Sequence, residues 1–451
     1  MTRLHIVKNR PDQIMVAILL LSVALRVAVA LYMGNQVTPL PGVADQESYH
    51  HLAQRLLGGH GFTVGENWWP VTQAGEPTAH WSYLYTLYVT AVYFLFGVNP
   101  LAARLIQAVA VGLLMPWLAY RLAHKLFSPT SITDERMVER EQGPWLGLAA
   151  AGITAVYIYF FYYAGALMTE SFYIVAILWT IDLALGIAQT ERPRLRQWLL
   201  LGLALGVTVL LRQLFLLFIP FLLAWLWWVK RPSPLKLALP LLVLLLFMLP
   251  WMVRNYLAFD QFVLLNTNSG YAFYWGNHPI YGAKFIPILP EEMGSYIDLL
   301  PKDLLRQNLS EAALDSALLR RALENIMADP GRYLLLSLSR IPPYFEFWPT
   351  ADSGLVSNLA RVGSFGLFLP FMLYGLWRTL RYRFPSWAAW LSSPFTLIYL
   401  FAIVYTAIHV LTWTLVRYRL PIDALLVQFA ALSLLLIANR RHARSRQVAP
   451  Q

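Results

Sequence analysis

The sequence predicts an all-α protein that crosses a membrane about ten times and carries two large outer loops. Of the 451 residues, 58% are hydrophobic and 13% are charged, whereas soluble domains have about 45–50% apolar and about 25% charged residues. Long apolar runs recur along the chain, and its 35 Lys and Arg residues gather in short tracts beside them. We interpret these tracts as topology signals and expect no nucleic-acid partner.

The first apolar run, residues 13–33, follows Arg3, Lys8 and Arg10. Basic residues favour the cytoplasmic side, so the amino terminus is expected there. No small-residue cleavage site follows the run, which is longer than the apolar core of a signal peptide, and we interpret it as a retained span. The other basic tracts, also expected in the cytoplasm, are Arg121 with Lys125, the mixed loop 128–143, and the tracts within 192–196, 230–236, 378–383 and 440–446.

These tracts decide how the apolar stretch 81–97 is placed. If it crossed the membrane completely, the loop 128–143 and the tract at 192–196 would lie outside, against the positive-inside rule. We therefore expect 81–97 to form a helix that lies in, or dips into, the outer interface. The remaining spans are 101–127, 145–163, 167–189, a pair within 198–229, then 237–257, 355–377, 393–411 and 421–438, with both termini inside.

The pair within 198–229 is unusually short. Two complete crossings need about 40 residues, which is more than this segment contains. We expect two short helices with a break near Arg212. Broken helices at membrane depth are tolerated where they line a polar cavity.

Two long segments, 34–100 and 258–354, lie on the outer side in this topology. Each contains apolar residues at helical spacing, which predicts amphipathic helices over 46–57 and 311–327. The residues that carry the pattern are Tyr49, Leu52, Ala53 and Leu56 in the first, and Leu314, Leu318, Leu323 and Met327 in the second. The chain is thereby divided into a transmembrane module over 1–257 that includes the first outer loop, the outer region 258–354, and the C-terminal helices with a basic tail over 355–451.

Ionisable residues stand at the outer ends of several spans. A charge at the bilayer centre costs roughly 2.5–3.5 kcal/mol on insertion scales, so a charged residue near a span is a candidate for function. The candidates are the carboxylates Asp45, Glu47 and Glu170 and the arginines Arg212, Arg254, Arg417 and Arg419. The predicted topology places all of them on the outer side.

Carboxylates and arginines at one membrane face suit transfer from a lipid phosphate. Arginine binds phosphate through forked, charged hydrogen bonds, and a carboxylate accepts a proton from an attacking hydroxyl. The head group of a lipid-phosphate sugar lies at this depth. Direct attack at its anomeric carbon would invert the configuration without a covalent enzyme intermediate. Because the chain has no cysteine, a thiolate nucleophile and Cys-ligated metals are excluded.

A series of short motifs extends from Leu25 to about Ala431. They are Asp45-Gln46-Glu47-Ser48-Tyr49, Ala103-Arg104, Thr169-Glu170, Leu211-Arg212, Pro250-Trp251, Arg254-Asn255, Gly270-Tyr271, Gly276-Asn277 and Arg417-Tyr418-Arg419-Leu420-Pro421. In order and in side of the membrane they resemble the C-type glycosyltransferases that use polyprenyl-phosphate sugars. The most similar branch is the bacterial one related to protein O-mannosyltransferases and lipid A aminoarabinose transferases.

The resemblance implies a C-type fold and an inverting glycosyltransferase with its site at the outer face of the cytoplasmic membrane. Asp45 would be the general base and Glu170 a second carboxylate of the site. Substrate contacts would come from Arg212, Arg254, Arg417, Arg419, Glu47, Asn277 and Tyr49. The donor would be a polyprenyl-phosphate sugar among the membrane lipids, and the acceptor a hydroxyl of a glycolipid, a glycan or a protein. No metal ligand is predicted, although the resemblance leaves a divalent cation possible.

Other interpretations of the same residues remain open. Asp45 could cap the helix that follows it, Glu47 could be a first-turn charge, and Arg254 could anchor its helix at the interface. A transporter or flippase of a lipid-linked substrate would also place charges at a cavity, but it usually shows an internal repeat, which we do not find here. A non-catalytic scaffold would need Asp45 only for stability or assembly.

Overall fold

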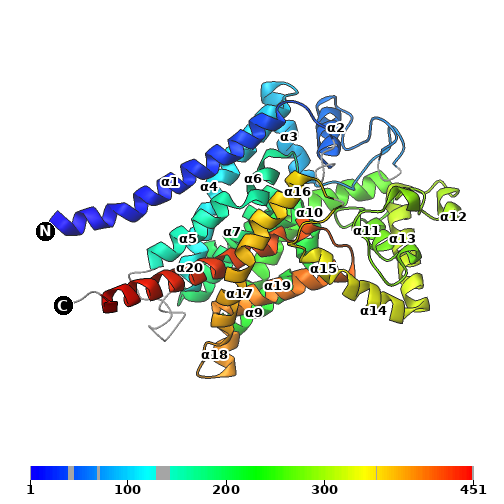
Figure 1. The fold of residues 1–451 in the computed structure, drawn as a ribbon. Helices are drawn as coiled ribbons and strands as arrows, with labels where there is room; N and C mark the ends of the chain where they lie inside the picture. Colours follow the sequence, from blue (N-terminus) through cyan, green and yellow to red (C-terminus); the bar gives the residue numbers. More distant parts are fainter. Residues whose placement is uncertain (1, 39–44, 69–71, 128–142, 352, 449–451) are drawn as a thin grey trace.

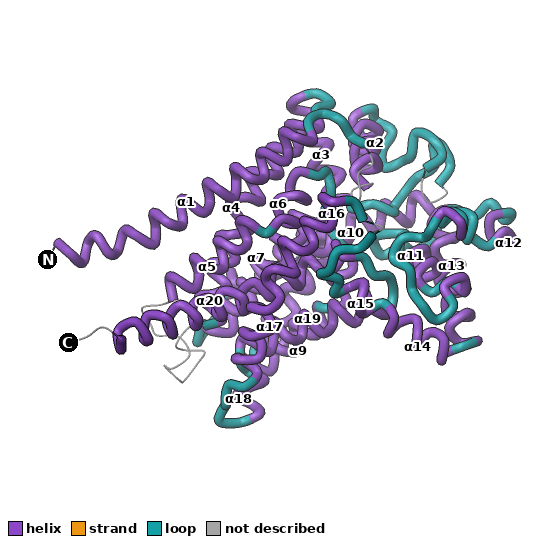
Figure 2. Tube along the Cα trace, viewed as in Figure 1, coloured by secondary structure: helices purple, strands orange, loops and turns teal. Residues whose placement is uncertain are grey.

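The chain folds into helices joined by loops, as the sequence predicts (Figures 1 and 2). The computed structural model describes residues 2–38, 45–68, 72–127, 143–351 and 353–448. Within these ranges the β pairings are two isolated bridges, Thr63 with Pro77 and Trp68 with Thr72. The loop 128–143, expected in the cytoplasm, lies outside the described residues except for its last residue.

Eight segments among the described residues are long and apolar enough to cross a bilayer, if the bent pair α5 and α6 is taken as one. They are α1 (Thr2–Met33), α4 (Pro100–Leu126), α5 (Gly143–Val156) with α6 (Ile158–Gly165), α7 (Glu170–Gln189), α10 (Pro234–Phe259), α16 (Leu355–Arg361) continued through the π-turn η5 (Val362–Gly366) into α17 (Leu367–Leu380), α19 (Pro394–Leu411) and α20 (Leu420–Val448). The short pair α8 (Leu195–Leu211) and α9 (Ile219–Lys230) corresponds to the other two predicted spans.

The break between α8 and α9 is where the sequence places it. Arg212 ends α8 with an extended backbone (φ −150°, ψ 113°), and a 3-10 turn, η2 (Gln213–Leu217), leads into α9. The helix over the predicted interfacial stretch is α3 (Tyr83–Phe96), which has 14 residues. At 1.5 Å per residue it is about 21 Å long, shorter than a hydrocarbon core of about 30 Å. An interfacial helix therefore agrees with the structure.

The predicted single span 145–163 is instead two helices, α5 and α6, bent by 53°. Arg26 of α1 donates to the carbonyl oxygens of Thr154 and Ala155, at 3.2 Å and 3.3 Å. At the bend, the Tyr157 hydroxyl donates to Asp423 at 2.7 Å. The two bonds from Arg26 satisfy carbonyl groups that the bend frees from the helix, and the bond from Tyr157 ties the bend to α20, so the break costs little. The partners of these hydrogen bonds, Arg26 and Asp423, belong to α1 and α20. The sequence around residue 157 alone therefore could not predict the bend.

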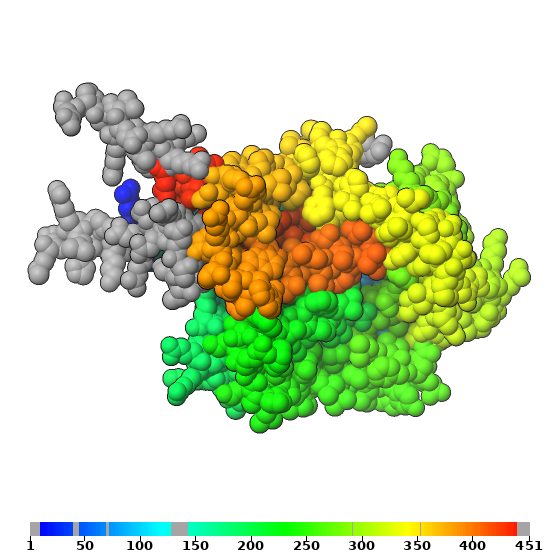
Figure 3. All heavy atoms as spheres, turned by 90° about the horizontal axis from the view of Figure 1, so that it is seen from below, coloured from blue at the N-terminus to red at the C-terminus, as the bar shows by residue number. Residues whose placement is uncertain are grey.

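Both chain ends lie at the same end of the helix bundle in Figure 1, and the elements that the sequence predicts on the outer side lie at the opposite end, which is called the outer end below. These outer elements are α2 (Asp45–Leu57), α11 (Ser269–Gly276), α12 (Lys302–Leu305), α13 (Glu311–Ala328) and α14 (Pro330–Ser339). On the face shown in Figure 3, the segment near residue 400 lies against the segment between residues 200 and 260. The Trp225 indole of α9 donates to the Leu391 carbonyl there at 3.1 Å.

The predicted apolar face of α2 is confirmed, because Tyr49, Leu52 and Ala53 are buried and Leu56 is partly buried. The face of α13 is only partly as predicted. Leu314 and Leu318 are buried, but Leu323 and Met327 are exposed. The buried face of α13 also includes two acids, Glu311 and Asp315, and Ala322 is its last buried residue.

These two acids join the outer loops into one layer. Glu311 accepts a hydrogen bond from the Ala79 amide at 2.8 Å, and also bonds the hydroxyl of Thr267. Asp315 accepts from the amides of Gly270 and Tyr271 at the start of α11, at 2.8 Å and 3.1 Å. The first outer loop and the segment after α10 are therefore both fastened to α13.

The most buried of the candidate spans are α7 and α20, which pack against each other. Both begin at the outer end of the bundle, α7 at Glu170 and α20 directly after the 3-10 turn η6 (Val416–Arg419). The fold thus brings residue 170 and residues 416–419 together at the outer end of the protein core.

Candidate functional site

Four of the predicted charged residues lie together at the outer ends of α7 and α20. They are Asp45, Glu170, Arg212 and Arg417. One guanidinium nitrogen of Arg417, Nη1, lies 3.1 Å from Oδ2 of Asp45, and its Nε lies 3.8 Å from Oε1 of Glu170. Arg212 forms an ion pair with the same Oε1 and donates from Nε to the Thr169 hydroxyl at 2.9 Å. The cluster therefore alternates acids and bases, with Glu170 shared between the two arginines.

The two carboxylates differ in exposure. The Asp45 side chain is 27% exposed and that of Glu170 is 3% exposed. The second oxygen of Glu170, Oε2, is buried and accepts no hydrogen bond from the described residues. Asp45 is accordingly the carboxylate that an incoming molecule can reach, and Glu170 is the one that anchors the arginines.

The position of Asp45 is fixed by its neighbour in sequence. Gln46 is buried, and its Oε1 accepts a hydrogen bond from Nη2 of Arg104 in α4 at 2.9 Å. The same guanidinium also bonds the Gly34 carbonyl after α1, and the Gln46 amide donates to the Thr38 carbonyl. The start of α2 is thereby tied to α1 and α4, which holds Asp45 at the edge of the bundle.

Aromatic rings surround the cluster. Tyr49, one turn after Asp45, packs edge-on against Trp81 and Tyr85, with centroids 5.7 Å and 4.7 Å apart. Burial, together with the negative charge of Asp45, raises the pKa of the Tyr49 hydroxyl well above its usual value, so this group stays protonated.

Tyr418 lies beneath both arginines. The guanidinium carbons of Arg417 and Arg212 are 5.4 Å and 5.8 Å from its ring centroid. The ring also stacks on His409, 4.8 Å away. An aromatic face stabilises a cation and restricts where its side chain can go, so Tyr418 helps to orient the two arginines.

The other predicted arginines are engaged within the protein. Arg254 donates to the carbonyl oxygens of Phe62 and Thr78, at 2.7 Å and 2.9 Å, and so fastens the first outer loop to α10. Arg419 is fully buried and donates to Asp423 at 3.0 Å and to the Tyr344 carbonyl at 2.7 Å. Arg419 and Arg417 belong to the same turn, η6. The bonds of Arg419 therefore hold in place the turn that carries Arg417.

Asn277 and Glu47 are also separate from the cluster's ion pairs. Asn277 is fully buried, and its Oδ1 accepts at 2.8 Å from Arg340, the residue directly after α14. Glu47 is half-buried in the first turn of α2, where the positive end of the helix dipole stabilises a carboxylate. The structure records no hydrogen bond or ion pair between its side chain and another described residue. Arg254, Arg419 and Asn277 thus make contacts that support the fold, and their predicted substrate contacts stay predictions.

Two supporting residues, Arg26 and Asp423, were not singled out by the sequence reasoning, and Arg104 entered it only within the Ala103-Arg104 motif. Each is an ionisable residue inside a predicted apolar span, and that signal was present in the sequence. What it could not show is the partner of each side chain. Within the described residues, no group of three or more His, Cys, Asp or Glu side chains is arranged to hold a metal ion.

Comparison with known proteins gives a family model and several solved structures. Residues 136–254 match the family model described as dolichyl-phosphate-mannose-protein mannosyltransferase. No curated protein sequence matches the chain.

The oligosaccharyltransferase of Archaeoglobus fulgidus, tethered with an acceptor peptide, is 15% identical, with a TM-score of 0.59 over 97% of this chain and 50% of its own. Its complex with an inhibitory peptide and a dolichol-phosphate is 14% identical, with a TM-score of 0.55 over 98% and 52%. ArnT from Cupriavidus metallidurans, bound to undecaprenyl phosphate, is 16% identical, with a TM-score of 0.45 over 93% and 59%.

The chain therefore spans about half the length of the solved structures it matches. At these identities the likeness concerns the fold. The matched family segment contains Glu170 and Arg212, two of the four residues that form the cluster. The chain has the fold of the archaeal oligosaccharyltransferase, and over residues 136–254 it resembles the dolichyl-phosphate-mannose-protein mannosyltransferases.

Proposed function

We propose that this protein is an integral membrane glycosyltransferase that moves a sugar from a polyprenyl phosphate to a hydroxyl acceptor. The reaction would take place at the outer face of the cytoplasmic membrane. The observation that carries this proposal is the position of Arg417 between Asp45 and Glu170, at the outer end of the buried helices α7 and α20. The dolichol-phosphate in the complex of the archaeal oligosaccharyltransferase supports a lipid-phosphate donor.

Asp45 has the properties of a general base. It is a carboxylate that stays partly exposed beside two partly buried arginines. In the proposed reaction Asp45 accepts the proton of the acceptor hydroxyl as that oxygen attacks the anomeric carbon of the sugar. The bond from the anomeric carbon to the phosphate oxygen breaks, and the polyprenyl phosphate leaves with the bonding electrons. One displacement of this kind inverts the configuration of the sugar.

Arg417 and Arg212 would bind the phosphate. Their N–H groups can form charged hydrogen bonds with its oxygens, and these bonds strengthen as negative charge develops on the leaving group. Glu170 keeps both guanidinium groups at the outer end of the bundle, because its Oε1 pairs with one and lies 3.8 Å from the other. Glu170 would thus be a positioning residue, and Asp45 the carboxylate that touches the acceptor.

Transfer from a defined donor tests the function. Membranes containing the full-length protein are supplied with polyprenyl phosphates that carry different radiolabelled sugars, and the label is followed into lipid, glycan and protein fractions. The proposal expects transfer from at least one donor, with inversion at the anomeric carbon in the product. Label that crosses the membrane still attached to its lipid, with no transfer from any donor, would support a flippase instead.

A further inference from the structure

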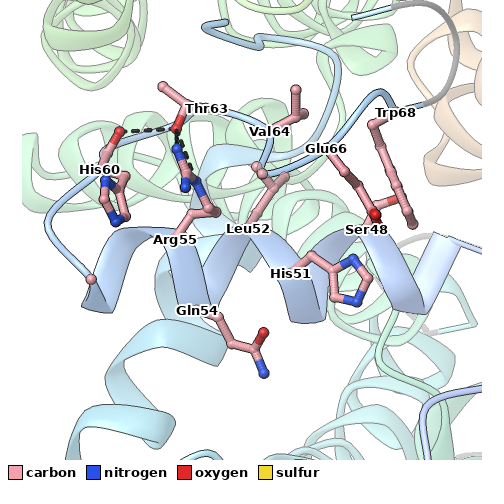
Figure 4. Close-up of a pocket in the computed structure, with 12 residues that line it drawn as sticks. Ser48, His51, Leu52, Gln54, Arg55, His60, Thr63, Val64, Glu66 and Trp68 are labelled. Atoms are coloured by element: carbon pink, nitrogen blue, oxygen red, sulfur yellow. Dashed lines mark hydrogen bonds between the residues drawn. The ribbon is translucent and has the colours of Figure 1, made fainter. Parts of the chain in front are cut away.

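A pocket of about 440 Å³ opens along one side of α2, outside the charged cluster (Figure 4). One wall is α2 from Ser48 to Arg55, together with Gly58 just after the helix. The other is the loop that follows, from His60 to Trp68. The mechanism proposed above uses none of the residues that line this pocket.

The loop is held over the helix by its own sequence. Gly59 and Gly61 have positive φ angles of 76° and 67°, a conformation that side-chain-bearing residues rarely adopt, and they turn the chain back along α2. Arg55 then bonds the Thr63 hydroxyl at 2.8 Å, and that hydroxyl donates to the His60 carbonyl at 3.0 Å. The pocket is therefore formed before any ligand arrives.

Its lining suits a carbohydrate. Trp68 packs edge-on against His51, with centroids 5.0 Å apart, and donates from its indole nitrogen to the Ser48 hydroxyl at 2.9 Å. An indole offers an apolar surface to the C–H face of a sugar ring. The exposed carboxylate of Glu66 lies near it (Figure 4), where it can bond sugar hydroxyls, and Gln54 also lines the pocket.

The charge of the lining favours a neutral ligand. Arg55 and Glu66 are the cation and the carboxylate of the pocket when its histidines are neutral, so their formal charges cancel. An anionic ligand would meet the Glu66 carboxylate. Moreover, the Arg55 guanidinium already donates to Thr63 from two of its nitrogens. A phosphate group or an acidic peptide is accordingly disfavoured.

The pocket ends close to the proposed base. Ser48 lies three residues after Asp45 in α2, which is about 4.5 Å along the helix axis at 1.5 Å per residue. We propose that this pocket binds a neutral saccharide unit of the acceptor, next to the hydroxyl that receives the transferred sugar. The inference rests on the proposed function and narrows its acceptor to a glycan or glycolipid.

Direct binding tests the pocket without transfer. The full-length protein in lipid nanodiscs is mixed with methyl glycosides of glucose, galactose, mannose and N-acetylglucosamine, and with a Ser/Thr-containing peptide, and binding is measured by saturation-transfer NMR. At least one glycoside should bind. Because a hydrogen bond to a charged group is lost, Glu66→Ala should raise its Kd about tenfold or more. Gln54→Ala should also weaken binding.

Lys284→Ala is the control, because Lys284 is exposed in the other outer segment. It should leave the Kd unchanged. Absence of binding by every glycoside, equal binding by Glu66→Ala, or preference for the peptide would overturn the inference.

The two proposals can fail separately. Glycoside binding that depends on Glu66, in a protein that transfers sugar from no donor, would support the pocket and contradict the glycosyltransferase. Sugar transfer with an acceptor KM that is the same in wild type, Glu66→Ala and Gln54→Ala would support the transferase and overturn the pocket.

Discussion

The guanidinium group of Arg417 lies 3.1 Å from the carboxylate of Asp45, although one residue precedes the last helix and the other begins the first outer helix. This ion pair joins the proposed base to a proposed phosphate ligand before substrate binds. A lipid phosphate that enters the cluster would compete with Asp45 for Arg417. Donor binding would then leave the Asp45 carboxylate available to the acceptor hydroxyl.

Arg417→Lys should weaken donor binding while the positive charge is kept. Lysine cannot form the forked contact of a guanidinium, and a charged hydrogen bond contributes roughly 1.5–3 kcal/mol. We expect the KM for the polyprenyl-phosphate donor to rise about tenfold or more, with a much smaller change for the acceptor. Steady-state transfer with each substrate varied in turn measures both. Arg320→Lys, at an exposed position of α13, is the control, and an unchanged donor KM in Arg417→Lys would contradict the assignment.

Glu170→Gln should destabilise the protein by leaving Arg212 without its ionic partner. Removing one member of a buried pair costs about 3–5 kcal/mol, and we expect the lower end because the Arg212 side chain is 21% exposed. Thermal unfolding in detergent measures the change.

A double-mutant cycle separates the interaction energy between Glu170 and Arg212 from the effects that each substitution has on its other neighbours. Glu170→Gln combined with Arg212→Gln should lose less stability than the two single variants added together, because neither charge is then left unpaired. Strictly additive losses would show that Glu170 and Arg212 do not stabilise each other.

Asp315 gives the outer layer a pH dependence. Burial in the contact between α13 and α11 raises the pKa of its carboxyl group to about 6, and nearby Glu311 adds to the effect, against the hydrogen bonds from Tyr271 and Gly270. The folded protein holds this proton more tightly than the unfolded chain does. The contribution of Asp315 to stability should therefore fall as the pH rises from about 4 to about 6.

Asp315→Asn removes this titration while an oxygen still accepts from the amides of α11. Hydrogen exchange of α11 and α13, compared between the two proteins at pH 4 and pH 6.5, measures the effect. The wild type should lose protection relative to Asp315→Asn as the pH rises. The same difference between the proteins at both pH values would contradict the raised pKa.

Much of the fold could be predicted because its signals are local. Apolar runs and basic tracts gave the spans, and the shortness of 198–229 gave the break at Arg212, since length is a strict requirement for crossing a bilayer. The bend at Tyr157 could not be predicted in the same way. It depends on Arg26 and Asp423, which are remote in sequence. Arg26 donates to the carbonyl groups that the bent helix leaves unpaired, and Asp423 accepts from the Tyr157 hydroxyl at the bend.

The sequence also predicted that several charged residues lie at the same side of the membrane, because charges beside apolar spans are a local signal. Topology places Asp45, Glu170, Arg212 and Arg417 on one side of the membrane, and the fold brings them into one cluster. Arg254 and Arg419 shared the same sequence signal. A sequence does not show whether a guanidinium faces a cavity or donates to backbone carbonyls, as that of Arg254 does.

The most direct test of the account is the rate of sugar transfer by Asp45→Asn. The amide keeps the shape of the side chain but cannot accept the acceptor's proton, and general base catalysis contributes typically 10²–10⁴-fold, so the rate should fall by about that factor. Asp260→Asn is a matched control, because Asp260 is exposed and has the left-handed backbone (φ 51°) that asparagine tolerates. Loss of transfer in Asp45→Asn alone, with both variants folded, is the predicted result. Equal transfer by the wild type and Asp45→Asn would contradict Asp45 as the base.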